Sequence, residues 1–239
     1  MTDAICAENL SKNYGKKAAL CGVSLSVKEG ELFGLLGVNG AGKTTLIKIL
    51  TGLCRKSGGT ATVGGYDLDR EMDRIKEIVD VSPQETAVAP NLTVEENLDF
   101  FAGIYGKHDP ARKEQIIRAF GLGEVLASRA RTLSGGWARR LSIAAALISE
   151  PKILFLDEPT LGLDVLARRE LWSIIRSLKG NITIVLTSHY LEEIEALCDR
   201  VAVLCRGKLL AVGTTGELCQ KTGTGKFEEA FVKMVEGNV

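Results

Sequence analysis

A nine-residue segment, GVNGAGKTT at 37–45, constrains the fold of this chain more than any other feature of its sequence. It matches the pattern G-x-x-x-x-G-K-[ST] and lies between an expected strand over 31–37 and an expected helix over 43–53. The backbone N–H groups of such a loop cradle phosphates, Lys43 reaches the β and γ oxygens, and the Thr44 hydroxyl binds Mg²⁺. The residues expected to bind the nucleotide here are Gly37, Val38, Asn39, Gly40, Ala41, Gly42, Lys43, Thr44 and Thr45.

A second segment ends in two adjacent acids. The run ILFLD at 153–157 is an unbroken apolar stretch, which is typical of a strand buried on both faces. Asp157 at its end is a suitable Mg²⁺ ligand, and Glu158 is expected to polarise the attacking water, an acid–base role worth about 10² to 10⁴ in rate. A solvated loop is the alternative for an Asp-Glu pair. The buried strand and the phosphate loop favour the catalytic interpretation.

Short apolar strands alternate with helical segments, which predicts a mainly parallel sheet covered by helices. Further strands are expected over 152–157 and 182–188. From about 90 to 149 strand signals are absent, and a capping box at Thr93 and Glu96 starts the first of three expected helices. Near the C-terminus the sequence VAVLCRGKLLAVG predicts a hairpin, followed by a short helical tail.

Composition excludes several classes of partner. The 239 residues carry 30 basic and 30 acidic side chains, so no global field attracts nucleic acid or anionic lipid. The six cysteines form no CxxC pair, which argues against a zinc site and a disulfide framework and favours reduced thiols in a cytoplasmic protein. No signal peptide and no run of roughly 20 apolar residues is apparent. Contact with a membrane would therefore need another chain.

The segment TLSGGWARRLSIAAALI at 132–148 places glycines where an amphipathic helix begins. Leu141, Ala144, Ala145 and Ile148 follow helical spacing, and Ser134-Gly135-Gly136 precede them. Glycines before a helix allow backbone N–H groups to approach an anion, and the helix dipole favours negative charge there. The segment therefore predicts a second anion site.

Taken together, these motifs resemble the ATP-binding subunits of ABC transporters in order and spacing over almost the whole chain. The phosphate loop, Leu133-Ser-Gly-Gly136, Leu156-Asp-Glu-Pro159 and His189 carry the resemblance, and the Leu-Ser-Gly-Gly element is its most specific mark. A GTPase is disfavoured because no Asn-Lys-x-Asp motif is present. In this family two domains pack head to tail, which implies that Ser134, Gly135 and Gly136 bind the γ-phosphate of ATP held by a partner subunit.

The resemblance implies an α/β fold: a P-loop NTPase with a RecA-like core, an inserted helical subdomain and a β-subdomain, the ABC ATPase fold. A single domain is expected over 3–222, with the core at about 3–88 and 150–213 and the helical subdomain at about 89–149. Residues 223–239 are expected to form a short helical tail.

Other site residues follow from the resemblance one position at a time. Tyr14 matches the aromatic residue that stacks on adenine, although a lone Tyr at a strand end is more often plain packing. Gln84 matches the glutamine that contacts Mg²⁺ and the lytic water, and His189 matches the histidine that senses the γ-phosphate. Asp164 matches the loop that couples the two nucleotide sites. The implied catalytic residues are thus Glu158, His189 and Gln84, and the implied metal ligands are Thr44, Gln84 and Asp157.

Two positions depart from the family pattern. Trp137 replaces the usual glutamine of the signature and cannot reproduce the hydrogen bonds of an amide, but it could pack against a ribose or a neighbouring loop. Leu161 and Val165 replace the usual Ser and Pro at the edges of the coupling loop. Because Gly162, Leu163 and Asp164 remain, this second departure is expected to have little effect.

The expected function is that of an ATP-binding and ATP-hydrolysing subunit that uses ATP and Mg²⁺ to power a separate membrane permease. Partners would be that integral membrane subunit and a second ATPase subunit, as a homodimer or heterodimer, at the cytoplasmic face of the membrane, with no nucleic acid. Resemblances in LTVEENLDFFAGIYG and FEEAFVKMVEG point to the drug-exporter branch. The alternatives are a soluble ABC ATPase of translation or DNA repair and a regulatory switch that hydrolyses little, which Glu158 disfavours. The apolar residues of 85–105 predict a docking groove for the permease beside Gln84.

Overall fold

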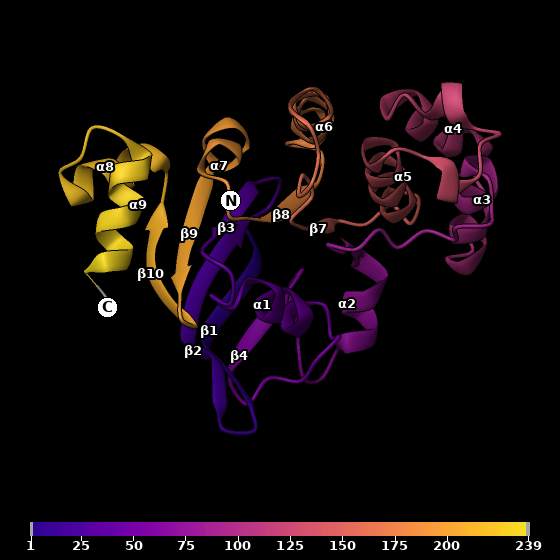
Figure 1. The fold of residues 1–239 in the computed structure, drawn as a ribbon. Helices are drawn as coiled ribbons and strands as arrows, with labels where there is room; N and C mark the ends of the chain where they lie inside the picture. Colours follow the sequence, from indigo (N-terminus) through magenta and orange to yellow (C-terminus); the bar gives the residue numbers. More distant parts are fainter. Residues whose placement is uncertain (1, 238–239) are drawn as a thin grey trace.

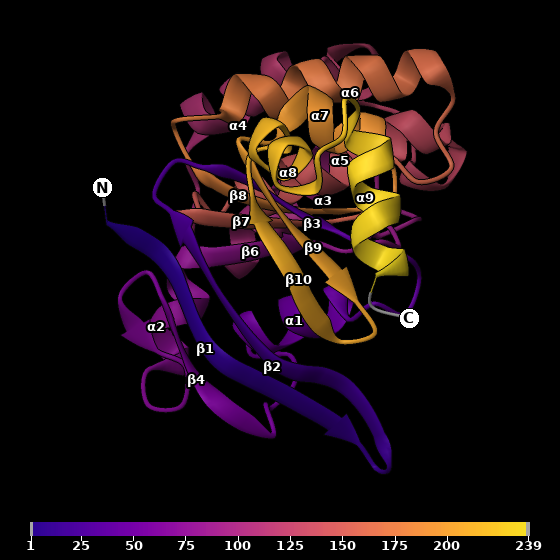
Figure 2. The same ribbon diagram turned by 90° about the vertical axis from the view of Figure 1, so that its left-hand side faces the viewer.

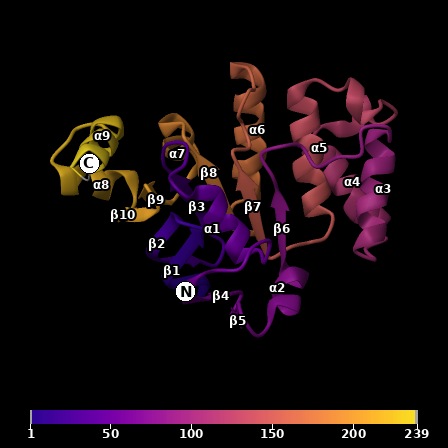
Figure 3. The same ribbon diagram turned by 60° about the horizontal axis from the view of Figure 1, so that its bottom comes forward.

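Two β-sheets form the centre of the computed structural model, which describes residues 2–237 (Figure 1). The larger sheet has six strands in the order β10-β9-β3-β8-β7-β6, and Figure 3 shows this order running toward the helical lobe. All of its pairs are parallel except the β9–β10 hairpin. The strands are β3 (Leu32–Leu36), β6 (Val79–Ser82), β7 (Ile153–Asp157), β8 (Thr183–Ser188), β9 (Arg200–Cys205) and β10 (Lys208–Gly213).

The smaller sheet is antiparallel and lies below the larger one in the view of Figure 2. Its order is β2-β1-β4-β5. The strands are β1 (Asp3–Tyr14), β2 (Lys17–Lys28), β4 (Gly58–Val63) and β5 (Tyr66–Asp67). The first two strands are joined by a tight turn that includes Gly15 at φ 58°, a left-handed conformation that suits glycine.

Helices cover both sides of the larger sheet. Helix α1 packs between the two sheets, whereas α5, α6 and α7 pack on the opposite face, and α3, α4 and α5 form a lobe at one end (Figure 1). Helices α8 and α9 pack at the other end. The helices are α1 (Lys43–Leu50), α2 (Met72–Ile78), α3 (Val94–Ile104), α4 (Pro110–Ala119), η1 (Leu122–Val125), η2 (Ala130–Thr132), α5 (Gly135–Leu147), α6 (Val165–Leu178), α7 (Leu191–Leu197), α8 (Thr215–Thr222) and α9 (Phe227–Glu236).

Side-chain alternation along the buried strands divides the core into two clusters. Ile153 and Phe155 of β7 pack with α1 and the smaller sheet, whereas Leu154 and Leu156 pack with the helices of the opposite face. Successive side chains of a strand point to opposite faces. Asp157 therefore projects to the same face as Phe155, which is the face that carries α1.

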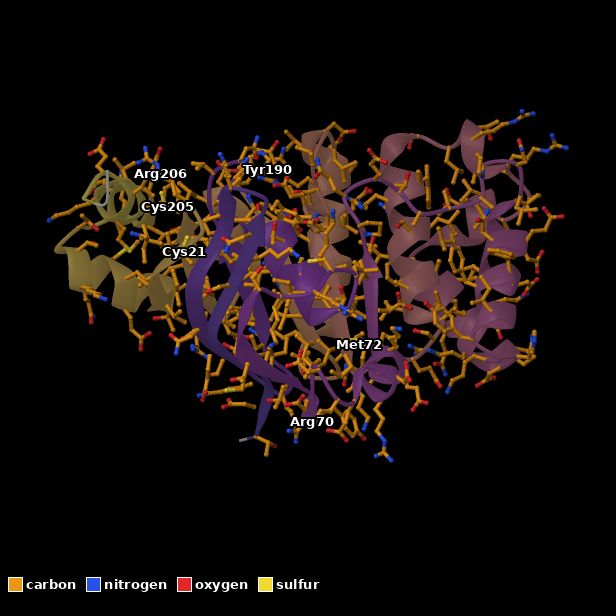
Figure 4. All side chains as sticks on the ribbon, turned by 90° about the horizontal axis from the view of Figure 1, so that it is seen from below. Cys21, Arg70, Met72, Tyr190, Cys205 and Arg206 are labelled. Carbon is orange, nitrogen blue, oxygen red and sulfur yellow. The ribbon has the colours of Figure 1, made fainter. Side chains whose placement is uncertain are left out.

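The elements expected from the sequence are present. The capping box at Thr93 and Glu96 starts α3, and the β9–β10 hairpin turns at Arg206 and Gly207 with φ 47° and 77°. This hairpin packs against β2, because the Cys21 N–H donates to the Gly207 carbonyl at 2.8 Å, and the labelled Cys21, Cys205 and Arg206 lie together in Figure 4. Helices α3 to α5 fall within the segment assigned to the helical subdomain. The division of the chain into core, subdomain and tail stays a prediction.

Candidate nucleotide-binding site

The candidate site lies where four parallel strands end. Strand β3 leads into the phosphate loop, β7 ends at Asp157, β8 leads to His189, and β6 leads to Gln84. Carboxyl ends of parallel strands meet at one edge of a sheet, which is where ligands bind in α/β proteins. A pocket of about 500 Å³ at this edge is lined by Tyr14, Lys17, Ala18, Ala19, Asn39, Gly40, Ala41, Gly42, Lys43, Thr44, Thr45, Gln84, Glu158, Leu161 and His189.

The phosphate loop has a backbone conformation that depends on glycine. Gly42 adopts φ 108° at the start of α1, and a Cβ there would lie 2.7 Å from a methyl of Leu20 and 2.8 Å from the carbonyl oxygen of Ala19. Among the residues that the structure describes, no side chain caps α1, so its first N–H groups lie at the pocket without a side-chain acceptor. Lys43 is 5% exposed and its Nζ donates to the Gly37 carbonyl at 2.6 Å. This cradle of N–H groups with one ammonium fits phosphate oxygens.

Asp157 lies directly against the first turn of α1. Its Oδ1 accepts a hydrogen bond from Thr44 Oγ1 at 3.3 Å and another from Thr187 Oγ1 at 2.6 Å. A hydroxyl and a carboxylate held together are oxygen donors of the kind that Mg²⁺ binds beside phosphates. Residues 2–237 contain no group of three His, Cys, Asp or Glu side chains suited to hold a metal ion. The Thr44 hydroxyl and the Asp157 carboxylate are a donor pair that fits Mg²⁺ beside phosphates.

Glu158 is held on every side. Its carboxylate contacts Lys43 Nζ at 3.3 Å through Oε1 and His189 Nδ1 at 3.1 Å through Oε2. Its N–H donates to Thr187 Oγ1 at 2.9 Å, and its carbonyl accepts from Arg139 at 2.8 Å. The backbone φ of 48° is unusual for a residue other than glycine and costs on the order of 1–3 kcal/mol. Such strain persists only where the surrounding contacts fix the residue.

Tyr14 lies at the outer end of the pocket with 48% of its surface exposed. Lys12 Nζ lies 4.8 Å from its ring centroid. Its hydroxyl lies 3.6 Å from the Cys54 sulfur, and this hydrogen bond, followed by burial, raises the pKa of Tyr14. An exposed ring beside a phosphate cradle is a suitable platform for a base.

Not every residue expected to bind the nucleotide lines this pocket. Gly37 and Val38 do not contribute to its lining, although the Gly37 carbonyl fixes Lys43. The signature residues lie elsewhere, because Ser134 and Gly136 line a separate hollow of about 440 Å³ together with Trp137, and Gly135 lies between them in sequence. Ser134 is the N-cap of α5 and its side chain makes no capping bond. Within one chain the two groups of predicted nucleotide ligands are therefore separate.

Sequence reasoning missed several residues of the site. Lys17, Ala18 and Ala19 line the pocket together with Tyr14, and only their place shortly after that residue in KNYGKKAAL could have indicated them. Thr187 bonds both Asp157 and the Glu158 amide, and its place within the apolar strand β8 gave no sign of this. Arg139 donates to the Glu158 carbonyl from α5, and no sequence pattern distinguishes it from the exposed arginines of the lobe.

The fold and this pocket define a phosphate-loop nucleoside triphosphatase. The family model described as ABC transporter matches residues 20–161. A second model, described as an AAA domain, putative AbiEii toxin, Type IV TA system, matches residues 129–195.

Relatives and solved structures agree with the first of these families. The linearmycin resistance ATP-binding protein of Bacillus subtilis is 42% identical over 91% of this chain and 71% of its own length. The daunorubicin/doxorubicin resistance ATP-binding protein of Streptomyces peucetius is 41% identical over 93% of this chain and 69% of its own length. A solved ATP-binding subunit of an ABC transporter superposes with a TM-score of 0.86 at 30% identity, covering 97% of this chain and 99% of that one.

The chain belongs to the ABC transporter family and is an ATP-binding, ATP-hydrolysing subunit that uses Mg²⁺. This membership confirms the fold and the ATPase activity expected from the motifs. Neither the repair nor the translation alternative finds support among these relatives. The roles of individual site residues stay predictions.

Proposed function

We propose that this chain hydrolyses ATP as one half of an ATPase dimer that drives export through a separate membrane permease. One observation supports the proposal: the phosphate pocket and the hollow lined by Ser134, Gly136 and Trp137 are separate cavities of one chain. Head-to-tail pairing of two such chains brings each signature helix over the other chain's pocket. Two composite sites result.

Within each pocket, different residues bind the phosphates, hold Mg²⁺ and accept the proton. Lys43 and the N–H groups of α1 bind the phosphates, and Thr44 with Asp157 would hold Mg²⁺, which supplies positive charge to the phosphate oxygens. Glu158 accepts a proton from the attacking water, and His189 orients its carboxylate from 3.1 Å. Because Lys43 also lies 3.3 Å from Glu158, nucleotide binding has to separate this pair before both can act.

Apolar residues at the coupling loop support pairing of two chains. Leu161, Val165 and Leu166 are exposed by 38%, 64% and 74% beside Asp164, which caps α6 by accepting hydrogen bonds from two backbone N–H groups. The structural role of Asp164 as the N-cap of α6 is compatible with its proposed coupling role, because the cap fixes the loop that carries the three exposed apolar side chains. A second subunit would cover them.

The proposed permease contact lies on the helical lobe. Among residues 2–237 no helix combines the length and the apolar character needed to cross a bilayer. Helix α3 runs along the outer edge of the lobe (Figure 1) and leaves Phe100, Ile104 and Tyr105 exposed by 49%, 60% and 41%. Leu98 is buried, and Val88 and Phe101 are half-buried. A cytoplasmic helix of the permease, docked here beside Gln84, would hold the chain at the cytoplasmic face of the membrane.

The proposed cargo is a drug, because two of the relatives are named for resistance to linearmycin and to daunorubicin/doxorubicin. The permease contacts such cargo, so the proposal concerns the class of transporter only. Cells that express the chain with its permease should accumulate less of a fluorescent drug, and Lys43→Ala should abolish that difference. Equal accumulation with and without the pair would contradict export.

Docking can be tested by cross-linking. Single cysteines placed from Ala87 to Asn91, in a background without the six native thiols, should cross-link to the co-expressed permease. Cysteines on α9, at the opposite end of the molecule, provide the control. Cross-links confined to α9 would contradict the docking site, and absence of any membrane-bound fraction would contradict the transporter role.

A further inference from the structure

Arg139 is a buried arginine on the signature helix α5, with 3% of its surface exposed. Its guanidinium lies between the segment that follows β6 and the segment that follows β7. The side chain donates to Pro159 from Nε at 2.8 Å, to Glu158 at 2.8 Å and Gln84 at 3.1 Å from one terminal nitrogen, and to Pro83 from the other. A longer contact of 3.4 Å reaches the Asp157 carbonyl.

All five acceptors are neutral backbone carbonyls. Within residues 2–237 Arg139 forms no salt bridge, so its charge is balanced only by carboxylates farther away. Burial lowers the pKa of Arg139, and the charges of Asp157, Glu193 and Glu158 oppose that shift. A buried cation is tolerated only where its N–H groups have hydrogen-bond acceptors. The planar guanidinium of Arg139 finds these acceptors in carbonyls on two separate segments. A lysine in its place has one nitrogen and cannot reach both.

The bonds of Arg139 end on the peptides that carry the proposed chemistry. Gln84 lines the nucleotide pocket, and Glu158 carries the proposed base. The Glu158 peptide is clamped between Arg139 on its carbonyl and Thr187 on its N–H, which explains how its left-handed φ of 48° is maintained. The direction of the Glu158 side chain toward Lys43 and His189 depends on that backbone conformation.

The same helix begins at the signature. Ser134 precedes the first turn of α5, and Arg139 follows five residues later, about 7.5 Å along the axis at 1.5 Å per residue. Backbone hydrogen bonds make this distance rigid. Any movement of the Ser134 end therefore moves the guanidinium, and with it the two clamped segments.

We propose that Arg139 is a positioning residue that couples the two nucleotide sites of the dimer. Closure of the signature helix on the partner's nucleotide, acting through Arg139, sets the Gln84 and Glu158 peptides of the same chain for hydrolysis of its own ATP. This inference rests on the proposed dimer. It differs from a purely structural role, because a structural arginine would affect stability without separating nucleotide binding from turnover.

The test compares Arg139→Met and Arg139→Lys with wild type in the full chain. Met keeps the apolar stem but removes every donor, whereas Lys keeps the charge with a single nitrogen. The control pair is Arg118→Met and Arg118→Lys on α4, where the native arginine is exposed and pairs with Glu114. We expect both Arg139 variants to bind MgATP within about twofold of wild type, and kcat to fall by about 10², the cost of a misplacement near 1 Å.

Hydrogen–deuterium exchange measures the coupling directly. Addition of Mg²⁺ with a non-hydrolysable ATP analogue should protect residues 134–138, 84–86 and 158–161 in wild type. In Arg139→Met, residues 134–138 should still gain protection from exchange, whereas residues 84–86 and 158–161 should show no gain in protection. If Arg139→Met shows no cooperative thermal transition, Arg139→Lys carries the same comparison.

Three outcomes would overturn the inference. They are a wild-type kcat in a folded Arg139 variant, a parallel change in all three segments, or an equal loss of kcat in the Arg118 controls. A fourth outcome tests the proposed function itself. If the wild-type protein turns over ATP no faster than Lys43→Ala, the proposed function is wrong, and this inference fails with it.

Discussion

Replacement of Glu158 by Gln should both tighten ATP binding and stop its hydrolysis. The carboxylate lies 3.3 Å from Lys43 Nζ, and both side chains are 10% exposed or less. At an effective dielectric constant near 20, unit charges at this distance attract with about 5 kcal/mol. The proposed phosphate-binding ammonium of Lys43 is therefore paired with a carboxylate of the same chain. ATP must displace the Glu158 carboxylate from Lys43, and its phosphates then place negative charge beside that carboxylate.

Desolvation offsets most of this gross attraction. If about 1.4 kcal/mol remains, the neutral amide should lower the Kd for MgATP about tenfold. Loss of the base should lower kcat by about 10² to 10⁴. Slow hydrolysis leaves ATP in place, so a dimer formed with MgATP should persist on size-exclusion chromatography.

The assay is equilibrium titration of MgATP, followed by single-turnover hydrolysis under the same conditions. Glu195→Gln on α7 is the matched control, because it removes the same charge from an exposed position. A Kd for Glu158→Gln equal to that of the control would refute the competition between carboxylate and phosphate. Wild-type turnover would refute the assignment of Glu158 as the base.

Three further changes test the remaining parts of the site. Lys43→Ala should abolish ATP turnover, because the ammonium neutralises phosphate charge, and a cooperative thermal melt should show that the fold is retained although the buried Lys43–Glu158 pair is lost. Tyr14→Ala should weaken ATP binding by about 1–3 kcal/mol in a titration, and Tyr14→Trp should restore it; equal affinity of Tyr14→Ala and wild type would exclude stacking. Ser134→Arg should leave monomeric ATP binding nearly normal but prevent the ATP-dependent dimer in the Glu158→Gln background, and a dimer of normal stability would place the signature outside the interface.

Much of the site follows from the sequence, because parallel strands bring sequence-distant motifs to one edge. Each of these motifs lies at the end of an apolar strand or directly after it, as the phosphate loop, Asp157, Glu158 and His189 do, and strands that are parallel in one sheet end together. Alternation along β7 then decides which face Asp157 occupies. The start of the helical lobe could also be predicted from the sequence, because the capping box at Thr93 depends on residues within one helical turn.

The position of a side chain that bonds only backbone carbonyls could not be predicted from the sequence. Arg139 and Arg140 are adjacent in the sequence, yet Arg139 is buried on carbonyls while Arg140 pairs with Glu170 and lies 4.7 Å from the Trp137 ring. Every residue offers a carbonyl, so no motif indicates which of them will converge on one guanidinium. The convergence depends on how α5 crosses the ends of β6 and β7, which is tertiary information. The motifs supply the groups that we propose bind ATP, and the packing of α5 supplies the link through which, by the same proposal, those groups respond to a second nucleotide.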